Sequence, residues 1–466
     1  MITGESRPVK KVVSAKVIAG TVNGSGSLQV KVSDIGEHTA LAGIMRLVAQ
    51  AQSSRSRAQA LADRAAFVLT ILALGAGTLT LLVWLSLNAS GAFAVERLVT
   101  VLVIACPHAL GLAIPLVIAI STTLAARSGV LIRDRLGLEN ARLINTVVFD
   151  KTGTLTRGEF GVVNVTTADN LNPDDALGLA AVVERDSEHT IARGIVRTAE
   201  ERKLTIPTAN AFEAIPGKGV RATIDGRQLY MGGPALLRSM GMTNPERLQQ
   251  AATEAGNRGN AAIYLIETGS ALAVFAVADM VRPESHDAVR LLHARGVQVV
   301  MMTGDARAVA ESVASDLGID LAFSEVLPEQ KASKIKELKH AGKRVAMVGD
   351  GVNDAPALVT ADVGIAIGAG TDVAVEAGDI VLVRNDPRDV PRILDLSKAS
   401  YRKMIQNLAW ATGYNLVAIP LAAGVLAHWG IVLSPAVGAL LMSVSTVIVA
   451  LNAQLLRRVQ LSLVGN

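Results

Sequence analysis

Apolar residues concentrate in four long segments of the chain, two before and two after a region of mixed polarity. Each segment reaches the length of about 20 residues that a helix needs to cross the hydrocarbon core of a bilayer. Any one of them alone has the alternative of a buried helix in a soluble protein, but two pairs together favour membrane spans. The segments are residues 66–87, 92–125, 404–426 and 431–456.

Basic residues flank the ends of these segments that adjoin the polar region. Arginine and lysine stay on the cytoplasmic side of membrane helices. The pattern therefore predicts a multi-pass protein of the plasma (inner) membrane whose N-terminus, catalytic domains and C-terminus are cytoplasmic. The flanking residues are Arg46, Arg55, Arg57, Arg64, Arg127, Arg133, Arg135, Arg402, Lys403, Arg457 and Arg458.

Between residues 140 and 397, short apolar strands alternate with helical patterns, and loops rich in glycine or aspartate follow the strands. This alternation predicts a parallel sheet wound by helices, with ligands at the carboxyl ends of the strands. The strand at 146–149 is separated from those at 297–302 and 345–348 by a long stretch with its own strand and turn signals. A second domain is therefore expected to be inserted there.

The composition fits a mixture of membrane and soluble parts. Hydrophobic residues make up 50% of the 466 residues and charged residues 18%, with a mean hydropathy of +0.39. The net charge of +4 does not indicate nucleic-acid binding, because arginines cluster beside apolar segments and aromatic residues are scarce. Cys106 is the single cysteine, so no disulfide can form within the chain.

Asp150 carries the chemistry expected of the soluble region. It opens the string DKTGTLT, residues 150–156, directly after an apolar strand. A carboxylate at a strand end can attack the terminal phosphate of ATP and form an acyl phosphate. An aspartate near glycine and threonine is more often a simple turn, but the full string after a strand is far more specific.

Three further loops supply what phosphoryl transfer needs: a hydroxyl and a close backbone, a positive charge, and carboxylates for Mg²⁺, which prefers oxygen ligands. Each loop alone reads equally well as a glycine turn, whereas their joint order after strands favours one site. The expected catalytic residues are Asp150, Lys151, Thr152, Thr303, Gly304, Asp305, Lys331 and Asn353, and the expected magnesium ligands are Asp150, Thr152, Asp350 and Asp354.

Cys106, Pro107 and His108 interrupt the second apolar segment, where a polar imidazole is costly and indicates function. Side chains two residues apart project to nearly opposite sides of a regular helix. Cys106 and His108 can therefore share one ion only if Pro107 and Pro115 unwind the helix locally. The alternative is a proline kink with a packed thiol.

Polar and sulfur-bearing side chains of the last two apolar segments are expected to face this motif. Asn407 and Tyr414 share a helix face, and Asn452 follows Met442 and Ser445 further along the last segment. Such residues ordinarily pack between helices. Their concentration favours an ion site, in which thiolate and thioether select Cu⁺ or Ag⁺ and imidazole also accepts Cu²⁺. The expected ion ligands are Cys106, His108, Tyr414, Asn415, Met442 and Ser445.

These motifs resemble the P-type ATPases of the haloacid-dehalogenase-like superfamily, over essentially the whole chain. The Cys-Pro-His motif, Tyr414-Asn415 and the string MSVST at 442–446 look like the copper and silver subgroup of the heavy-metal branch. The resemblance implies a multidomain membrane protein. It would combine an α-helical transmembrane bundle, an α/β Rossmann-like phosphorylation domain, an inserted α+β nucleotide-binding domain and a partial β actuator domain. It also implies ATP, Mg²⁺, export of Cu⁺, Cu²⁺ or Ag⁺, and a copper carrier protein as a further partner.

The resemblance also assigns roles to individual residues. Glu5, in a Thr-Gly-Glu loop, would position the water that removes the phosphate. Thr152 stands where related phosphatases have a second aspartate, which implies an acyl phosphate that hydrolyses slowly in place. A Ser-Glu-His string, with Thr190 in place of the usual proline, and a later Gly-x-Gly imply an ATP site. The expected ATP-binding residues are Glu188, His189, Gly217 and Gly219.

Family members normally have four more N-terminal spans and a complete actuator domain, so a truncated chain is expected, and pumping by this polypeptide alone is in question. Alternatives are a pump for zinc, cadmium or cobalt, a membrane phosphatase, and a non-pumping fragment. The expected domains are a partial actuator (1–40), a cytosolic linker helix (41–65), a transmembrane pair with Cys-Pro-His (66–126), a phosphorylation domain (140–158 and 276–396), a nucleotide-binding domain (159–275) and a C-terminal transmembrane pair (397–458).

Overall fold

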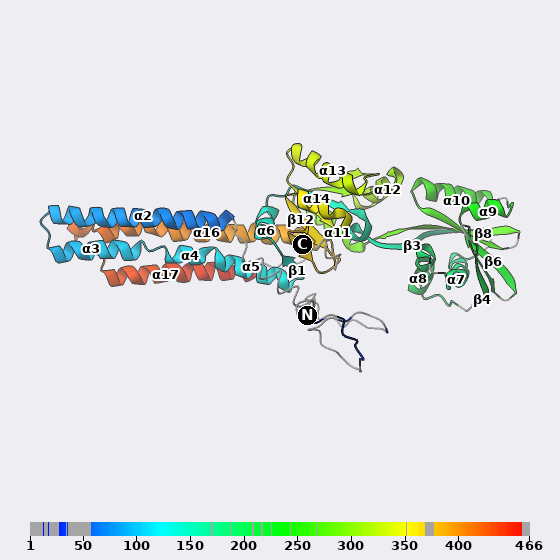
Figure 1. Cartoon of the computed structure of the whole chain (residues 1–466), viewed down its shortest axis with the longest axis horizontal. Helices are drawn as coiled ribbons and strands as arrows, with labels where there is room; N and C mark the ends of the chain where they lie inside the picture. Colours follow the sequence, from blue (N-terminus) through cyan, green and yellow to red (C-terminus); the bar gives the residue numbers. More distant parts are fainter. Residues whose placement is uncertain are drawn as a thin grey trace.

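The chain forms three successive bodies along one long axis: a helical bundle, a middle α/β domain and a distal α/β domain (Figure 1). The predicted fold class is thereby confirmed for these parts, while most of the partial actuator domain expected at 1–40 lies outside the described residues. The computed structural model describes residues 13, 17, 28–33, 35, 57–168, 171–187, 189–206, 209–215, 218–224, 226–242, 244–267, 269–350, 352–368 and 377–458.

The bundle contains three helical stretches, among the described residues, that are long and apolar enough to cross a membrane: Ala58–Ser86, Gly91–Arg127 and Pro435–Arg458. The predicted segment 404–426 is not among them, because amide and phenol side chains interrupt it. It nevertheless lies in the bundle as the far part of α16 (Figure 1). The bundle helices are α2 (Arg57–Ser86), α3 (Gly91–Ile104), α4 (His108–Ala113), α5 (Pro115–Arg127), α16 (Asp389–Ala423) and α17 (Pro435–Gln454).

Small side chains allow α16 to approach α3, the helix that leads into the Cys-Pro-His motif, closely. Ala418 and Ala422 pack with Val101 and Ile104 of α3 in one buried cluster. Close backbone approach through small residues is the usual way in which membrane helices associate. The far part of α16 is therefore an integral member of the bundle, and its crossing of the membrane stays a prediction.

The middle domain is built on a seven-stranded sheet in which every neighbouring pair is parallel except β1 and β13. Val147 and Phe149 of its central strand face one buried cluster and Val148 faces another, so helices cover both faces. The predicted wound parallel sheet is confirmed. Its strands, in spatial order, are β1 (Val130–Ile132), β13 (Ile380–Leu382), β12 (Val363–Ile367), β11 (Val345–Gly349), β2 (Thr146–Asp150), β9 (Gln298–Met302) and β10 (Leu321–Phe323).

The distal domain is a six-stranded antiparallel sheet, as expected for an inserted unit. The helices α7 (Pro173–Glu184) and α8 (Thr190–Glu201) cover one face of it, and α9 (Pro234–Ser239) and α10 (Glu246–Asn257) cover the other. The long paired strands β3 and β8 lead into it from the middle domain (Figure 1). The strand order is β3 (Thr156–Thr167), β8 (Ser270–Val281), β7 (Ala261–Glu267), β6 (Arg227–Gly232), β5 (Gly219–Ile224) and β4 (Asn210–Ile215).

Two connections join the bundle to the middle domain. One runs from α5 into β1, and the other is the continuous helix α16, on which α6 (Arg135–Ala141) packs. Ser397 of α16 donates a hydrogen bond to the carbonyl of Leu138, and the Arg142 guanidinium lies 3.6 Å from the Tyr401 ring centroid. These contacts hold α6 of the middle domain against α16.

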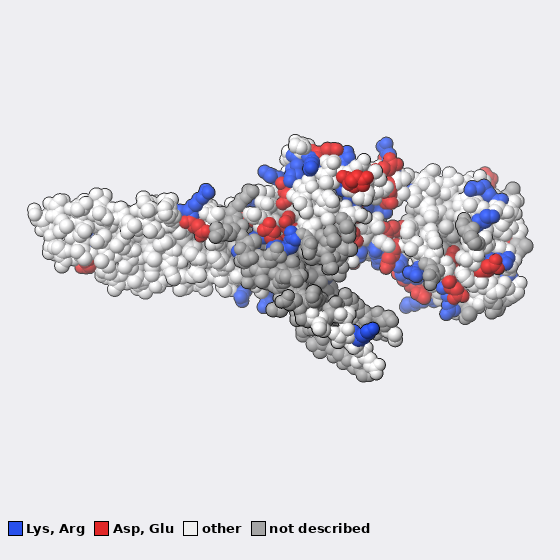
Figure 2. All heavy atoms as spheres, viewed as in Figure 1, with Lys and Arg blue, Asp and Glu red and all other residues white. Residues whose placement is uncertain are grey.

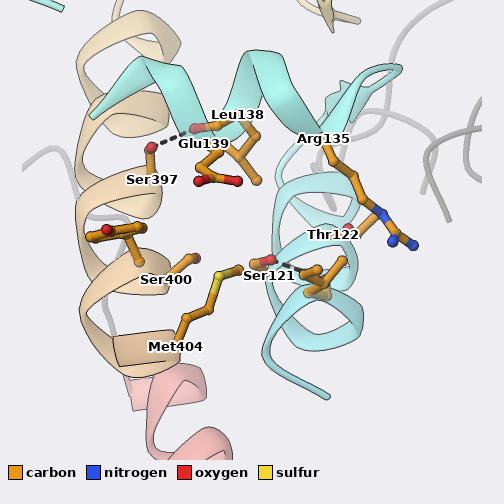
Figure 3. Close-up of a pocket in the computed structure, with 10 residues that line it drawn as sticks. Ser121, Thr122, Arg135, Leu138, Glu139, Ser397, Ser400 and Met404 are labelled. Atoms are coloured by element: carbon orange, nitrogen blue, oxygen red, sulfur yellow. Dashed lines mark hydrogen bonds between the residues drawn. The ribbon is translucent and has the colours of Figure 1, made fainter. Parts of the chain in front are cut away.

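A small cavity lies at this junction, between α5, α6 and α16 (Figure 3). Ser400, Ser121, Met404 and Glu139 line it. The Ser400 hydroxyl is buried and has no hydrogen-bond partner, in contrast to Ser397 one turn away. Two buried serines of one helix thus differ in whether their hydroxyl is satisfied.

This difference predicts opposite effects of two alanine substitutions. Ser397→Ala removes a buried hydrogen bond and should destabilise the protein by about 1–2 kcal/mol. Ser400→Ala removes an unsatisfied hydroxyl and should be neutral or stabilise by up to about 1 kcal/mol. Thermal unfolding in detergent measures both. A loss of stability in Ser400→Ala as large as that in Ser397→Ala would contradict the assignment.

Candidate functional site

The central strand β2 delivers Asp150 to the carboxyl edge of the parallel sheet. Its neighbours are β9, which ends before Thr303, and β11, which ends before Asp350. Because parallel strands finish at the same edge, the three predicted loops meet there. Asp150 is 7% exposed and Thr303 3% exposed, so these two side chains lie at the buried inner part of the edge.

Lys331 bridges two carboxylates at this edge. Its Nζ lies 2.5 Å from Oδ1 of Asp150 and 2.7 Å from Oδ1 of Asp354, and all three side chains are buried. Lys331 belongs to the first turn of α13 (Pro328–His340), where Pro328 begins the helix. The lysine predicted to neutralise the transferring group thus already pairs with the expected nucleophile.

Three carboxylates form a group that suits a divalent cation. Ligand oxygens of Asp150, Asp350 and Asp354 lie within 4.8 Å of one another. One lysine offsets only part of their charge, and an all-oxygen donor set is what Mg²⁺ prefers. The residues present therefore fit magnesium. Thr152, the fourth predicted ligand, is exposed in the same loop.

Burial and mutual repulsion perturb the acids of this group. Burial, together with the charge of Asp354, raises the pKa of Asp150 to about 7, although Lys331 opposes the change. Burial and Asp354 also raise the pKa of Asp350. Burial works against the charge of Lys331, but the two carboxylates beside it raise its pKa above the ordinary value. The carboxylates of the site thus repel one another, and a bound cation would reduce this repulsion.

Glycines allow the loops to approach so closely. Gly153 has φ of 76°, and a Cβ at this position would lie 2.0 Å from Oδ2 of Asp350. A Cβ on Gly349 would lie 2.4 Å from Oδ2 of Asp354. Neither position can carry a side chain without displacing an acid of the group.

A second ion pair positions the loop after the nucleophile. Lys151 Nζ lies 2.5 Å from Oδ2 of Asp305, and the Thr303 hydroxyl donates to the same carboxylate over 2.8 Å. These bonds outweigh burial and lower the pKa of Asp305. Gly304 and Asn353 are exposed beside the site. The predicted catalytic residues are therefore gathered at one sheet edge, apart from Glu5, which lies outside the described residues.

The strands leading to the distal domain are tied to the same loop. Asp279 of β8 accepts a hydrogen bond from Thr156 over 2.6 Å, and Arg282 donates to the carbonyls of Gly153 and Thr156. Asp279 and Arg282 lie where the chain returns from the distal to the middle domain. Their contacts hold the loop that follows Asp150, which spacing along the chain could not reveal.

The predicted nucleotide residues are described only in part, since Glu188 and Gly217 lie outside the described residues. His189 is exposed at the start of α8, where its Nδ1 accepts a hydrogen bond from the amide of Ile191 over 3.3 Å. Gly219 has φ of 155°, and a Cβ there would lie 2.0 Å from the carbonyl of Met231.

Glu184 is a residue that sequence reasoning missed. It ends α7, in which residues 176–183 before it are apolar or glycine, is 7% exposed, and lies just before the Ser-Glu-His string. Burial raises its pKa to about 7, although a hydrogen bond with Ser187 opposes the change. An acid directly after this apolar stretch was the available signal.

The ion motif, which is Cys106-Pro107-His108, interrupts its helix as predicted. α3 ends at Ile104 and α4 begins at His108, and within the break the His108 amide bonds the carbonyl of Cys106 over 2.8 Å. In a regular helix that amide would bond the carbonyl of Ile104. The Tyr414 hydroxyl donates to this released carbonyl over 2.9 Å. Tyr414 is thus at the break, with its proton committed to the backbone.

Two predicted ligands have unused oxygen atoms. Oδ1 of Asn415 and Oγ of Ser445 are buried and lack hydrogen-bond partners, which is costly unless another group satisfies them. Met442 is half-buried one turn before Ser445, while Cys106 and His108 are exposed. The residues present fit a cation site with mixed sulfur, nitrogen and oxygen donors.

Asn407 and Asn452, expected near the ion, bond elsewhere. Asn452 donates to Oδ1 of Asn407 over 2.8 Å, and Asn407 donates to the carbonyl of Ala113 over 3.0 Å. Lys403 donates to Asn452 in turn. These amides fix the second helix break, before Pro115.

The fold joins a wound parallel sheet, with a buried aspartate at its edge, to an apolar helical bundle. Residues 144–362 match the haloacid dehalogenase-like hydrolases, and residues 1–49 match the P-type ATPase actuator domain. The chain belongs to the P-type ATPase family.

Three relatives illustrate the match. The copper-exporting P-type ATPase B of Archaeoglobus fulgidus is 55% identical over 98% of this chain and 65% of its own length. The probable copper-transporting P-type ATPase B of Staphylococcus aureus is 44% identical over 97% of this chain and 67% of its own length. The crystal structure of a zinc-transporting PIB-type ATPase in an E2.Pi state matches with 31% identity and a TM-score of 0.72, over 91% of this chain and 68% of that one. The chain thus spans about two thirds of the length of these relatives.

The raised pKa of Asp150 predicts a pH-dependent stability in magnesium-free buffer. The folded state binds this proton more tightly than the unfolded chain, whose carboxyl pKa is near 3.8. The contribution to stability is therefore complete below that value and is lost as the pH rises through about 7. Thermal unfolding in chelator should show a flatter pH profile for Asp150→Asn than for the wild type. Glu184 is present in both proteins, so its own titration cancels, and parallel profiles would contradict the prediction.

Proposed function

We propose that this chain carries the catalytic and ion-translocating machinery of an ATP-driven copper or silver exporter that forms an acyl phosphate on Asp150. The observation that carries the proposal is the buried contact of Lys331 with Asp150 at the sheet edge. The domain that contains this contact is joined through α5 and α16 to the bundle in which the helix is broken between α3 and α4. The proposed division into actuator, phosphorylation, nucleotide-binding and transmembrane domains follows from the same architecture.

The phosphorylation step assigns a task to each residue. The Asp150 carboxylate attacks the terminal phosphorus of ATP, the bond to the leaving ADP oxygen breaks, and an acyl phosphate forms. Lys331 fixes the attacking carboxylate and offsets charge on the transferring group. Magnesium, held by Asp150, Asp350 and Asp354, would supply further charge neutralisation. Thr152 offers no carboxylate to activate water, which supports slow hydrolysis until Glu5 arrives with the actuator loop.

The ion site supports a soft metal. Cys106 and Met442 supply sulfur, His108 supplies nitrogen, and Asn415 and Ser445 supply unused buried oxygens. The two relatives named for copper share 55% and 44% identity with this chain, against 31% for the zinc-transporting structure. Copper or silver is therefore favoured over zinc, cadmium or cobalt. A copper carrier protein as donor is part of the same proposal.

The orientation follows from the basic flanks. With arginines at the domain-side ends of the bundle, the middle and distal domains lie in the cytoplasm and the loops joining α2 to α3 and α16 to α17 face outward. ATP is then hydrolysed inside the cell, and the ion leaves at the end of the bundle remote from the nucleotide. The membrane is proposed to be the plasma (inner) membrane.

Metal-dependent ATP turnover in membrane preparations tests this function. Copper or silver should stimulate turnover, whereas zinc, cadmium and cobalt should not. Cys106→Ala should abolish the stimulation, and Asp150→Asn should lower turnover at least about 100-fold because the nucleophile is lost. Zinc stimulation that survives Cys106→Ala would overturn the metal assignment, and undiminished turnover in Asp150→Asn would overturn the mechanism.

A pair of His189 substitutions tests the nucleotide site. His189→Ala removes both the imidazole and the N-cap of α8, whereas His189→Asn keeps a good N-cap and removes the imidazole alone. If the imidazole contacts ATP, both variants should raise the KM for ATP about tenfold, with kcat near the wild-type value at saturation. An effect confined to His189→Ala would show that the residue serves only as a helix cap.

A further inference from the structure

One adjacent pair of charges stands apart in the apolar segments of the chain. Glu96 and Arg97 are the only Asp, Glu, Lys or Arg residues within 66–126, and 404–456 contains none. On the face shown in Figure 2, the part of the bundle remote from the domains is almost wholly uncharged. Ionisable groups in membrane segments are costly and indicate function.

The pair is asymmetric, with a buried base and an accessible acid. The Arg97 side chain is fully buried, whereas that of Glu96 is 46% exposed, and Nη2 lies 2.5 Å from Oε1. Arg97 also donates to the carbonyl of Leu433 and lies 5.2 Å from the centroid of the Phe93 ring. The base is thus fixed between α3 and the start of α17, and the carboxylate it holds remains available.

The exposed stripe of α3 leads from the carboxylate toward the Cys-Pro-His break. It runs through Glu96, Val99 and Leu102, and the exposed Cys106 follows after the helix ends at Ile104. The helix advances eight residues from Glu96 to Ile104, which corresponds to about 12 Å along the axis. The helix α3, which carries Glu96, lies on the far side of the break from the middle domain (Figure 1). An ion that leaves Cys106 outward along this stripe meets apolar side chains before the carboxylate.

We propose that Glu96 is the outward-side ligand that receives the exported cation from the Cys-Pro-His break before release, with Arg97 as the residue that positions it. A carboxylate oxygen binds a soft cation more weakly than a thiolate does, so the ion passes to a site from which it can escape. Arg97 holds the carboxylate in place and pairs with it again once the ion has left. This inference rests on the proposed transport function.

The test measures acyl-phosphate formation from radiolabelled ATP, ATP turnover and copper transport for the membrane-embedded protein in vesicles. Glu96→Gln keeps the shape of the side chain and removes its charge. Phosphorylation should stay at the wild-type level, while turnover and transport should fall about tenfold because release is slowed. Glu96→Asp should recover most of the loss, and Val99→Ala, on the same stripe, should behave as the wild type.

Two results would overturn the inference. The first is turnover and transport in Glu96→Gln within about twofold of the wild type. The second is a parallel loss of thermal stability, phosphorylation and turnover in Glu96→Gln, without recovery in Glu96→Asp, which would show that Glu96 only neutralises a structural arginine. Failure of the wild type to form a copper-dependent acyl phosphate would refute the proposed function instead.

Discussion

The contact between Lys331 and the carboxylates of Asp150 and Asp354 is the constraint on which the rest of the soluble structure depends. Three acids meet at one buried edge, and repulsion among them would separate the loops if no cation lay between them. A single lysine leaves the group short of positive charge. The group therefore keeps an excess of negative charge, which a divalent cation would offset.

The loops around this contact can form because the sheet delivers them. The strand β2 is separated along the chain from its two neighbours in space, β9 and β11, by an entire inserted domain. Glycine at 153 and 349 then removes the side chains that would collide with Asp350 and Asp354. Asp279 and Arg282 tie the same loop to the strands that lead into the distal domain.

In the bundle, the constraint is the backbone: each break in a helix frees carbonyl groups that need new hydrogen-bond donors. Pro107 ends one helix segment, and Tyr414 takes over the carbonyl of Ile104 that the break releases. Asn407 bonds the carbonyl of Ala113 at the second break. Backbone groups freed within a membrane need such partners. Tyr414 and Asn407, two side chains expected near the ion, thus stabilise the two helix breaks through hydrogen bonds to the backbone.

The sequence by itself determined the strand that carries Asp150, the wound parallel sheet, the inserted domain and the helix break at Pro107, because each follows from local periodicity or from the covalent geometry of proline. Tertiary structure alone decided that Lys331 pairs with both Asp150 and Asp354. It likewise decided that Arg282 bonds the loop after Asp150 and that Glu184 is buried just before the Ser-Glu-His string. It also decided which amides bond the backbone and which, such as Asn415, keep an unused oxygen. These outcomes depend on distances between residues far apart in the chain, and a one-dimensional pattern carries no information about which distant side chain reaches a given atom first.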